Sequence, residues 1–389
     1  MSADPGLANA DFARLEAANS TFAAPAAGLM SPANGAGLHA DSPHSLADGA
    51  TRWPVLDGIP YLRAGREEVR AAALAALDDG RPDDAAAVLL ADNDDWWDQP
   101  PPPADQLRAT LAAPTLREAV AGLGLGRVGD YFLHRDHDPS GLAVLALTAA
   151  HPPAGRPVLD LACGAGHLLR RLAQHGERDL TGVDVVFAKL WLARRFVVPE
   201  HVALVCADLA HPWPVPVRRD AYVAAHDVLY FLDDPAAVLA TAARHAGDGG
   251  AVVAAHCHNT GQPGHPRPPE AWAALLPGAS CYGEEELTAA TLERRLPRSA
   301  AAEDLADTEA VALARDALAA PDDALLDPAP GADLRPNPLY ADGARRWPND
   351  VWADEYGPRA ATYLPPTWPD PLPPDAAARR LLVDLPGAW

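Results

Sequence analysis

The chain has 389 residues, of which 49% are hydrophobic, and its formal net charge is −22 at neutral pH. This length allows one well-buried domain with additions. A chain this acidic lacks the basic surface that binds nucleic-acid phosphates, so we expect no DNA or RNA partner.

The cysteines and the N-terminus indicate a cytoplasmic protein. Cys163, Cys206, Cys257 and Cys281 form no CxxC pair, and three of them lie in or beside apolar runs. Buried free thiols fit a reducing compartment. No cationic segment precedes an apolar run near Met1, and no uncharged stretch reaches membrane-spanning length. We therefore expect a cytoplasmic protein without a membrane partner.

Residues 1–130 predict an arm and an accessory region. Residues 1–51 are rich in Ala, Gly, Pro and Ser without clear periodicity, which is typical of a flexible arm. Residues 52–130 predict a hairpin that turns at Asp57-Gly58, followed by helices. The expected elements are the hairpin at 53–63 and helices at 67–77, 83–91 and 107–123, the last broken at Pro114.

Residues 131–389 predict an α/β domain with a C-terminal extension. Apolar strand-like runs alternate with helix-like runs, which predicts a parallel, doubly wound sheet that binds its ligand at the carboxyl ends of the strands. The strand-like runs are 158–161, 180–183, 203–206, 222–225 and 251–256, and the helix-like runs are 167–174, 187–195 and 236–245. Further helices are expected at 270–275, 284–294 and 305–318, with the last strands at 334–340 and 361–364.

The stretch at residues 157–166, PVLDLACGAG, reads as a strand, a glycine turn and the start of a helix. Glycines let the backbone approach a ligand, and a helix N-terminus offers unpaired N–H groups to it. The dinucleotide fingerprint requires a small residue where Leu169 stands. The stretch instead resembles motif I of the class I S-adenosylmethionine-dependent methyltransferases, in which a glycine is usual at the place of Ala162.

Later segments continue this resemblance in the family's order. Asp184 follows the second strand, Asp208 the third, and His226-Asp227 the fourth, while residues 244–250, RHAGDGG, resemble the turn before the fifth. The resemblance implies a Rossmann-like, mostly parallel seven-stranded methyltransferase sheet with helices on both faces. It also implies S-adenosylmethionine as the cofactor.

The resemblance places the cofactor on the strand ends. Asp184 would accept the ribose hydroxyls, Asp208 would face the adenine amino group, and Asp160 would face the methionine part. The structural alternatives are a helix cap, a surface turn and a turn-holding acid, respectively. The residues expected to bind the cofactor are Asp160, Ala162, Gly164, Gly166, Asp184, Val185, Asp208, Leu209 and His226.

Methyl transfer needs alignment of the acceptor, the methyl carbon and the sulfur, and a hydroxyl acceptor also needs a base. The candidate bases are His226, His256 and His258, and we rank the first two higher because they lie directly at strand ends. The alternative for each is a structural hydrogen bond. His256 and His258 point the same way on an extended chain, but no carboxylate-rich cluster accompanies them, so we expect no metal.

The polar segment at residues 131–139, YFLHRDHDP, precedes motif I, where the family often places a lid. It predicts substrate contacts, the alternative being a salt-bridged turn. The residues expected to contact the acceptor are Tyr131, His134, Arg135, Asp227, Tyr230 and Asn259.

The predicted function is methyl transfer to a small molecule. We favour a hydroxyl of a specialised metabolite or sugar as the acceptor, with a histidine as general base. The alternatives are N- or C-methylation, a cofactor-binding protein without activity and, against the charge, RNA methylation. No oligomeric state is predicted.

Overall fold

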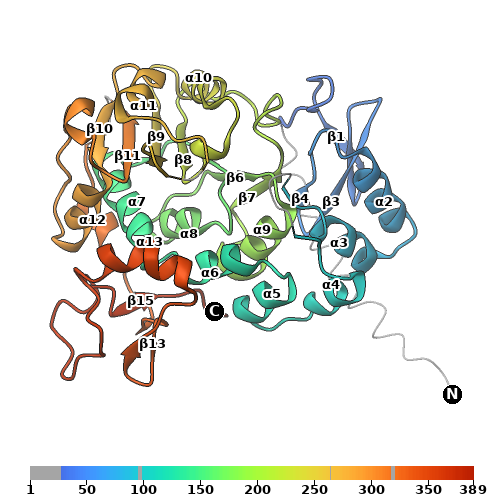
Figure 1. Ribbon diagram of the computed structural model, residues 1–389. Coiled ribbons are helices and arrows are strands. Elements are labelled where there is room, and N and C mark those ends of the chain that lie inside the picture. The colour runs from blue at the N-terminus through green and yellow to red at the C-terminus, as the bar shows by residue number, and fades with distance from the viewer. Residues whose placement is uncertain (1–27, 95–98, 263, 317–319) are drawn as a thin grey trace.

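The central sheet of the computed structural model has seven strands in the order β10-β11-β9-β8-β5-β6-β7 (Figure 1). The structure describes residues 28–94, 99–262, 264–316 and 320–389. The strands are β5 (Val158–Leu161), β6 (Leu180–Asp184), β7 (Ala203–Cys206), β8 (Tyr222–His226), β9 (Ala251–His258), β10 (Ser280–Gly283) and β11 (Ala310–Arg315). Only β11 runs antiparallel to its neighbours within this sheet. The predicted seven-stranded, mostly parallel sheet is confirmed.

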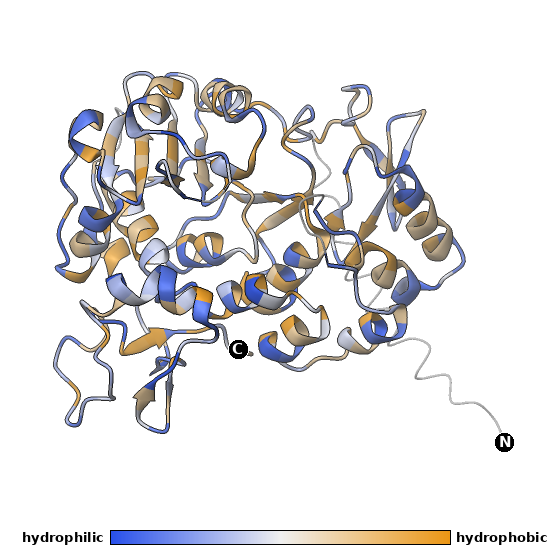
Figure 2. Cartoon of the chain, in the orientation of Figure 1, coloured by the Kyte–Doolittle hydropathy of each residue, from blue (hydrophilic) through white to orange (hydrophobic). Residues whose placement is uncertain are grey.

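Helices cover both faces of the sheet. Figure 1 shows α10 (Pro235–Ala246) and α11 (Pro269–Leu275) on one side, and α7 (Pro139–Ala150), α8 (His167–Gln174) and α9 (Phe187–Leu192) on the other. Apolar residues dominate the strands and the inward faces of these helices (Figure 2). In the described residues, no helix is both long and apolar enough to cross a membrane.

Helix α7 is buried on nearly all sides because α12 (Glu284–Leu292) packs along it. Its start is fixed by Asp138, whose side chain accepts a hydrogen bond from Gly141 N. The preceding helix α6 (Gly126–His134) therefore ends in a tight turn beside the carboxyl edge of the sheet.

The N-terminal region extends the sheet at its β7 edge. The predicted hairpin is present as β3 (Arg52–Leu56) and β4 (Ile59–Pro60), turning at Asp57-Gly58. The chain then runs along β7, where Leu62 N donates to Cys206 O at 2.7 Å. The helices that follow are α2 (Glu67–Asp78), α3 (Pro82–Leu90), α4 (Ala104–Thr110) and α5 (Leu116–Gly122).

Part of the segment expected as a flexible arm is folded. Residues 28–51 contain β1 (His39–Ser42) and β2 (Ser45–Ala47), which pair with each other and with β3. Leu46 is 1% exposed and packs in the same cluster as Trp53, which explains why this stretch is ordered despite its composition. Residues 1–27 lie outside the described residues, and the division into three domains remains a prediction.

The C-terminal expectations were partly wrong. Residues 305–318 were expected to form a helix, but β11 lies there, between β9 and β10. Both of its faces are buried, so its apolar run has no alternation to distinguish it from a helix. Residues 334–340 and 361–364 are not in the central sheet: the first contains β12 (Leu334–Pro336), and the second is a turn.

The extension packs as small elements against α7 and α12. Helix α13 (Asp350–Ala360) lies below the sheet in Figure 1, and β12 pairs with β15 (Leu382–Asp384). The remaining short elements are β13 (Tyr340–Ala341), β14 (Ala344–Arg345), the 3-10 turns Leu229–Phe231, Ala302–Leu305 and Asp323–Leu326, and the π-helical turn Ala193–Val197.

Candidate active site

A cavity of about 900 Å³ lies at the carboxyl ends of the parallel strands. One wall comes from the ends of β5, β6 and β7, and the other from the residues after β8, from α6, from α13 and from the C-terminal segment. Its size is typical of a site that binds a cofactor and a small molecule. We call the first wall the cofactor half and the second wall the acceptor half, after the ligands that the sequence predicts for them.

In the cofactor half, the glycine turn after β5 is tied to β6 by Asp184. Gly164 N donates to Asp184 Oδ2 at 2.9 Å, and Val186 N donates to Oδ1 at 2.9 Å. Lys189 Nζ lies 3.6 Å from Oδ1. Asp184 therefore holds the turn and also lines the cavity, so the capping and the binding roles are compatible.

The turn contains two left-handed residues that line the cavity, Ala162 with φ +53° and Gly164 with φ +55°. The first explains why a glycine is usual at that place. Gly166 does not line the cavity, contrary to the expectation that it binds the cofactor. A Cβ on Gly166 would lie 2.6 Å from Val198 Cγ1, so packing within the protein requires this glycine.

The other acids expected at the strand ends also line the cavity. Asp160 is 3% exposed, and its burial, with the charge of Asp184, raises its pKa to about 8 despite the nearby Arg135. It is therefore mostly protonated at neutral pH. Asp208 accepts a hydrogen bond from Ala210 N at 2.8 Å. Val185 and Leu209 add apolar surface to the cavity.

His226 ends β8 and lines the cavity between the two halves. Neither ring nitrogen has a hydrogen-bond partner in the described part of the chain. Burial, with the charge of Arg135, lowers its pKa to about 3, so the ring is neutral at physiological pH. A neutral imidazole with unused nitrogens can accept a hydrogen bond from a ligand hydroxyl, and the charge of Asp227 favours the protonated form of this ring.

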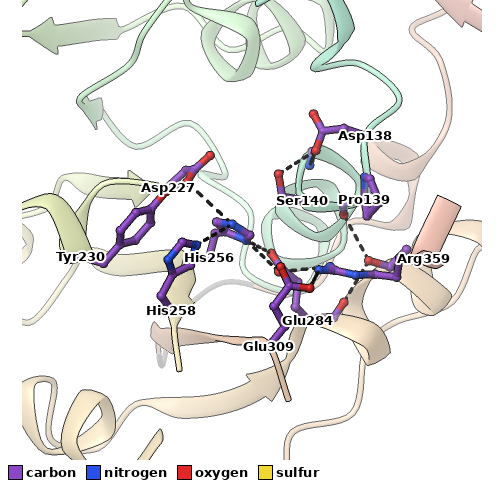
Figure 3. A network of polar contacts seen from close by, with 12 residues as sticks. Asp138, Pro139, Ser140, Asp227, Tyr230, His256, His258, Glu284, Glu309 and Arg359 are labelled. Atoms are coloured by element: carbon purple, nitrogen blue, oxygen red, sulfur yellow. Dashed lines mark hydrogen bonds and ion pairs between the residues drawn. The ribbon is translucent and has the colours of Figure 1, made fainter. Parts of the chain in front are cut away.

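His256 occupies a different environment, in a network of charged side chains (Figure 3). Its Nδ1 lies 2.8 Å from Glu284 Oε2, and its Nε2 lies 3.9 Å from Asp227 Oδ1 and 3.1 Å from His258 Nε2. Burial alone would lower the pKa of His256, but the charges of Glu284 and Asp227 raise it to about 9. It is thus a cation at neutral pH, does not line the cavity, and is poorly suited to act as a base.

His258 lines the cavity but is engaged on two sides. Its ring stacks on Tyr230 with centroids 3.6 Å apart, and its Nε2 accepts from the protonated His256. Arg359 of α13 extends the same network, because it donates to Glu284 at 3.1 Å and pairs with Glu309. These ion pairs therefore connect α13, which is part of the acceptor half, to α12 and β9.

Four of the six expected acceptor contacts lie on the cavity: Tyr131, Arg135, Asp227 and Tyr230. Burial alone would raise the pKa of Asp227, but the charges of His256 and Arg135 lower it to about 2, and Tyr230 donates to it at 2.5 Å. The other two do not line the cavity. His134 faces His137 at 3.1 Å, and Asn259 donates to Ala306 O and Thr308 O.

Several residues of the cavity were not identified from the sequence. They come from the N-terminal region, from α9 and from the C-terminal segment: Arg63, Lys189, Trp352, Glu355, Tyr356 and Arg380. Among these residues, only Lys189 is conspicuous in the sequence, because it is the single lysine of the chain. In the described residues, no group of three His, Cys, Asp or Glu side chains is arranged to hold a metal ion.

A family model, described as a methyltransferase domain, matches residues 158–250. The match runs from β5 to the turn before β9, and it includes the glycine turn, Asp184, Asp208 and His226. The chain contains a class I S-adenosylmethionine-dependent methyltransferase domain. The predicted enzyme class and cofactor are confirmed for this methyltransferase domain.

Solved structures of other methyltransferases are similar to this chain over part of its length. They include phosphoethanolamine N-methyltransferase 2 of Haemonchus contortus (15% identity, 44% of this chain, 51% of that chain, TM-score 0.32). Another is a possible histamine N-methyltransferase of Thermotoga maritima (14% identity, 49% of this chain, 94% of that chain, TM-score 0.36). A third is an S-adenosylmethionine-dependent methyltransferase of Mesorhizobium loti (22% identity, 44% of this chain, 96% of that chain, TM-score 0.34).

The methyltransferase-domain assignment does not depend on these structures, because their TM-scores are below 0.5. The chain spans about half the length of the Haemonchus enzyme, 51%. No curated protein matches the chain.

Proposed function

We propose that the chain transfers the methyl group of S-adenosylmethionine to a hydroxyl of a small molecule, with His226 as general base. The observation that carries this proposal is the pair of unpartnered ring nitrogens of His226 on the cavity, at the end of β8. Neither His256 nor His258 offers a comparable free nitrogen, because Glu284 and their mutual contact occupy them.

The residues of the cofactor half fit S-adenosylmethionine by charge and position. Asp184 offers carboxylate oxygens for the ribose hydroxyls, Asp208 for the adenine amino group, and Asp160 for the methionine ammonium group. When bound, the cofactor supplies an electrophilic methyl group on a good leaving group. The protein then has to orient the acceptor, exclude water and remove one proton.

The acceptor half supplies orientation. Tyr131, Tyr230, Trp352 and Tyr356 line it, and the last three are buried. Such rings give a rigid apolar wall with a few polar atoms, which suits a small organic molecule. Asp227 and Arg135 add a fixed charge pair 3.9 Å apart. With the net charge of −22, this lining favours a small molecule over RNA.

N-methylation is the second candidate, and Asp227 favours it. This carboxylate is ionised at the cavity, where it would hold the N–H of an amine acceptor. The amine would attack as its free base, so no histidine would be needed.

The test measures S-adenosylhomocysteine release with a panel of phenols, sugars and amines. For a hydroxyl acceptor, His226→Ala should lower turnover by about 10²–10⁴-fold without weakening cofactor affinity. His226→Gln keeps the side chain's size and should be equally impaired. His201→Ala is the control, because His201 is exposed, precedes β7 and does not line the cavity, so turnover of this variant should stay at the wild-type level.

The pH profile adds a second readout. Because the pKa of His226 is about 3, turnover should show no acid limb between pH 5 and pH 8. A wild-type rate in His226→Ala, or a loss of cofactor affinity alone, would mean that His226 is not the base. Turnover with amines only would favour N-methylation.

A further inference from the structure

Arg380 stands apart from the other arginines of the cavity. It lies in the C-terminal segment, lines the cavity, and is only 5% exposed. In the described residues, no group accepts a hydrogen bond from its Nε or Nη2. Its φ of +55° is in the left-handed region, which an arginine rarely adopts. A buried, unpaired and strained guanidinium is costly, which points to a partner of opposite charge.

The two unsatisfied atoms form one edge of the guanidinium. The N–H bonds of Nε and Nη2 point in parallel, and this fork matches the two oxygens of a carboxylate, sulfate or phosphate group. The unused groups of Arg380 thus define both the charge and the shape of the missing partner: an oxyanion that binds in a bidentate way.

Arg171 of α8 is a second cation in the same part of the cavity. Its Nη2 donates to the carbonyl oxygens of Leu325 and Asp327, while its Nε has no partner in the described residues. Burial, followed by the charge of Arg380, lowers the pKa of Arg171 to about 10. Two buried like charges at one cavity wall repel each other, and an anion between them would remove this repulsion.

The neighbouring acids do not fill this role, because none of them accepts a hydrogen bond from Nε or Nη2 of Arg380 in the described residues. Asp384 pairs with Arg170 at 2.8 Å, and Asp136, whose charge favours the Arg380 cation, lies 3.7 Å from His167. Asp327 pairs with Arg294. Arg380 and Arg171 therefore leave an excess of positive charge in this part of the cavity.

We propose that Arg380, with Arg171, forms an oxyanion subsite that binds a carboxylate, sulfate or phosphate group of the acceptor. This inference rests on the proposed function and names its substrate class, an anionic small molecule. Arg380 belongs to the extension outside the matched segment 158–250 that carries the cofactor acids. The extension also supplies Trp352 and Tyr356 to the acceptor half, which places the subsite on the acceptor's side.

The test uses the full chain saturated with S-adenosylhomocysteine and measures the binding of inorganic phosphate, and separately of sulfate and acetate, by calorimetry. One phosphate should bind per chain, and Arg380→Met should weaken it by about tenfold or more, the loss expected for a charge-assisted fork. Arg380→Lys keeps the charge without the fork and should give an intermediate affinity. Arg379→Met is the matched control, since Arg379 is 51% exposed and pairs with Asp375 at 2.7 Å.

Two results would overturn the subsite. Phosphate affinity that is equal in wild type and Arg380→Met would mean that the guanidinium is only structural. Competition between phosphate and S-adenosylhomocysteine, or weaker S-adenosylhomocysteine binding in Arg380→Met, would assign Arg380 to the cofactor's carboxylate instead. If Arg380→Met fails to fold, the phosphate affinity of Arg380→Lys and the competition experiment on the wild type still distinguish the subsite from these two alternatives. Because the readout is binding, the subsite and methyl transfer can fail separately.

Discussion

The two halves of the cavity are held together in different ways. In the cofactor half, side chains bond to backbone groups of the adjoining strand ends, as Asp184 does to Gly164 N and Val186 N. In the acceptor half, side chains from distant segments bond to one another. Glu284 joins His256 of β9 to Arg359 of α13, for example.

This difference has physical consequences. A carboxylate that accepts hydrogen bonds from backbone N–H groups keeps its partners as long as the strand and turn are folded. Few single substitutions remove such backbone groups. A buried ion pair depends on both side chains, and the loss of one leaves an uncompensated charge. We therefore expect the acceptor half to respond strongly to single substitutions and to pH, while the cofactor half responds mainly to the ligand.

The largest expected effect is that of Glu284→Gln. Glu284 is fully buried between His256 and Arg359, so its neutralisation removes the carboxylate that the two cations share and leaves only Asp227 beside His256 and Glu309 beside Arg359. The free energy of unfolding should fall by about 3–5 kcal/mol, measured by urea unfolding. The folded variant should still bind S-adenosylhomocysteine with wild-type affinity, because the cofactor half is untouched.

The matched control is Glu286→Gln, two residues along α12. Glu286 is 28% exposed and pairs with Arg295, so its loss should cost about 1 kcal/mol or less. Equal losses in the two variants would show that the Glu284 network is no more important than a surface ion pair. A loss of cofactor affinity in Glu284→Gln would show that the two halves are not independent.

The second expected effect is a fall in stability with rising pH. The pKa of His256 is about 9 in the folded chain, against 6.5 as its ordinary value. A raised pKa means that the folded state holds its proton more tightly, so this stabilisation is complete below pH 6.5 and lost as the pH rises through 9. It amounts to about 3–4 kcal/mol, because the two pKa values differ by about 2.5 and each pKa unit corresponds to about 1.4 kcal/mol.

The measurement is urea unfolding between pH 6.5 and pH 8, below the ordinary thiol pKa of about 8.5. The wild type should lose stability across this range, and His256→Gln, which cannot titrate, should show a flatter profile. Parallel profiles would mean that another group causes the loss.

The same difference explains what the sequence could predict. The glycine turn, Asp184 and Asp208 are positioned by strands that alternate with helices, and this pattern is local. Glu284 and Arg359 have no local signal, because only the folded chain brings them to His256. Gly166 was assigned to the ligand although Val198 requires it, since a pattern of glycines does not show what each one faces.

The strands outside the matched segment show how far the sheet can be predicted from the sequence. β11 is buried on both faces, so its apolar run lacks the alternation by which a strand differs from a helix. The parallel strands β5 to β9 were recognised because helix-like runs, or the Pro-rich loop between β7 and β8, separate their apolar runs. The sheet could therefore be predicted up to β9, and the antiparallel strand beyond it could not.

The smallest expected effect tests the cofactor half, and it concerns Asp160. Its burial, with the charge of Asp184, raises its pKa to about 8, so at pH 7 the free protein holds Asp160 mostly protonated. A methionine ammonium group beside it would favour the carboxylate. Binding of S-adenosylmethionine at pH 7 should therefore release close to one proton, and the affinity should rise about tenfold from pH 6 to pH 7, which is about 1.4 kcal/mol.

Calorimetry at pH 7 in buffers of different ionisation enthalpy measures the released proton directly. Asp160→Asn keeps the shape of the side chain without a titrating group, so it should release no proton and lose this pH dependence. The free protein should be more stable at pH 7 in this variant, because wild-type Asp160 has to take up a proton on folding, whereas Asn is neutral in both states. If wild type and Asp160→Asn release the same number of protons, the ammonium group does not face Asp160, and the methionine part lies elsewhere in the cavity. A pH-dependent affinity that disappears in Asp160→Asn would instead show that the cofactor half changes its charge with its ligand, whereas the acceptor half fixes its charges on folding.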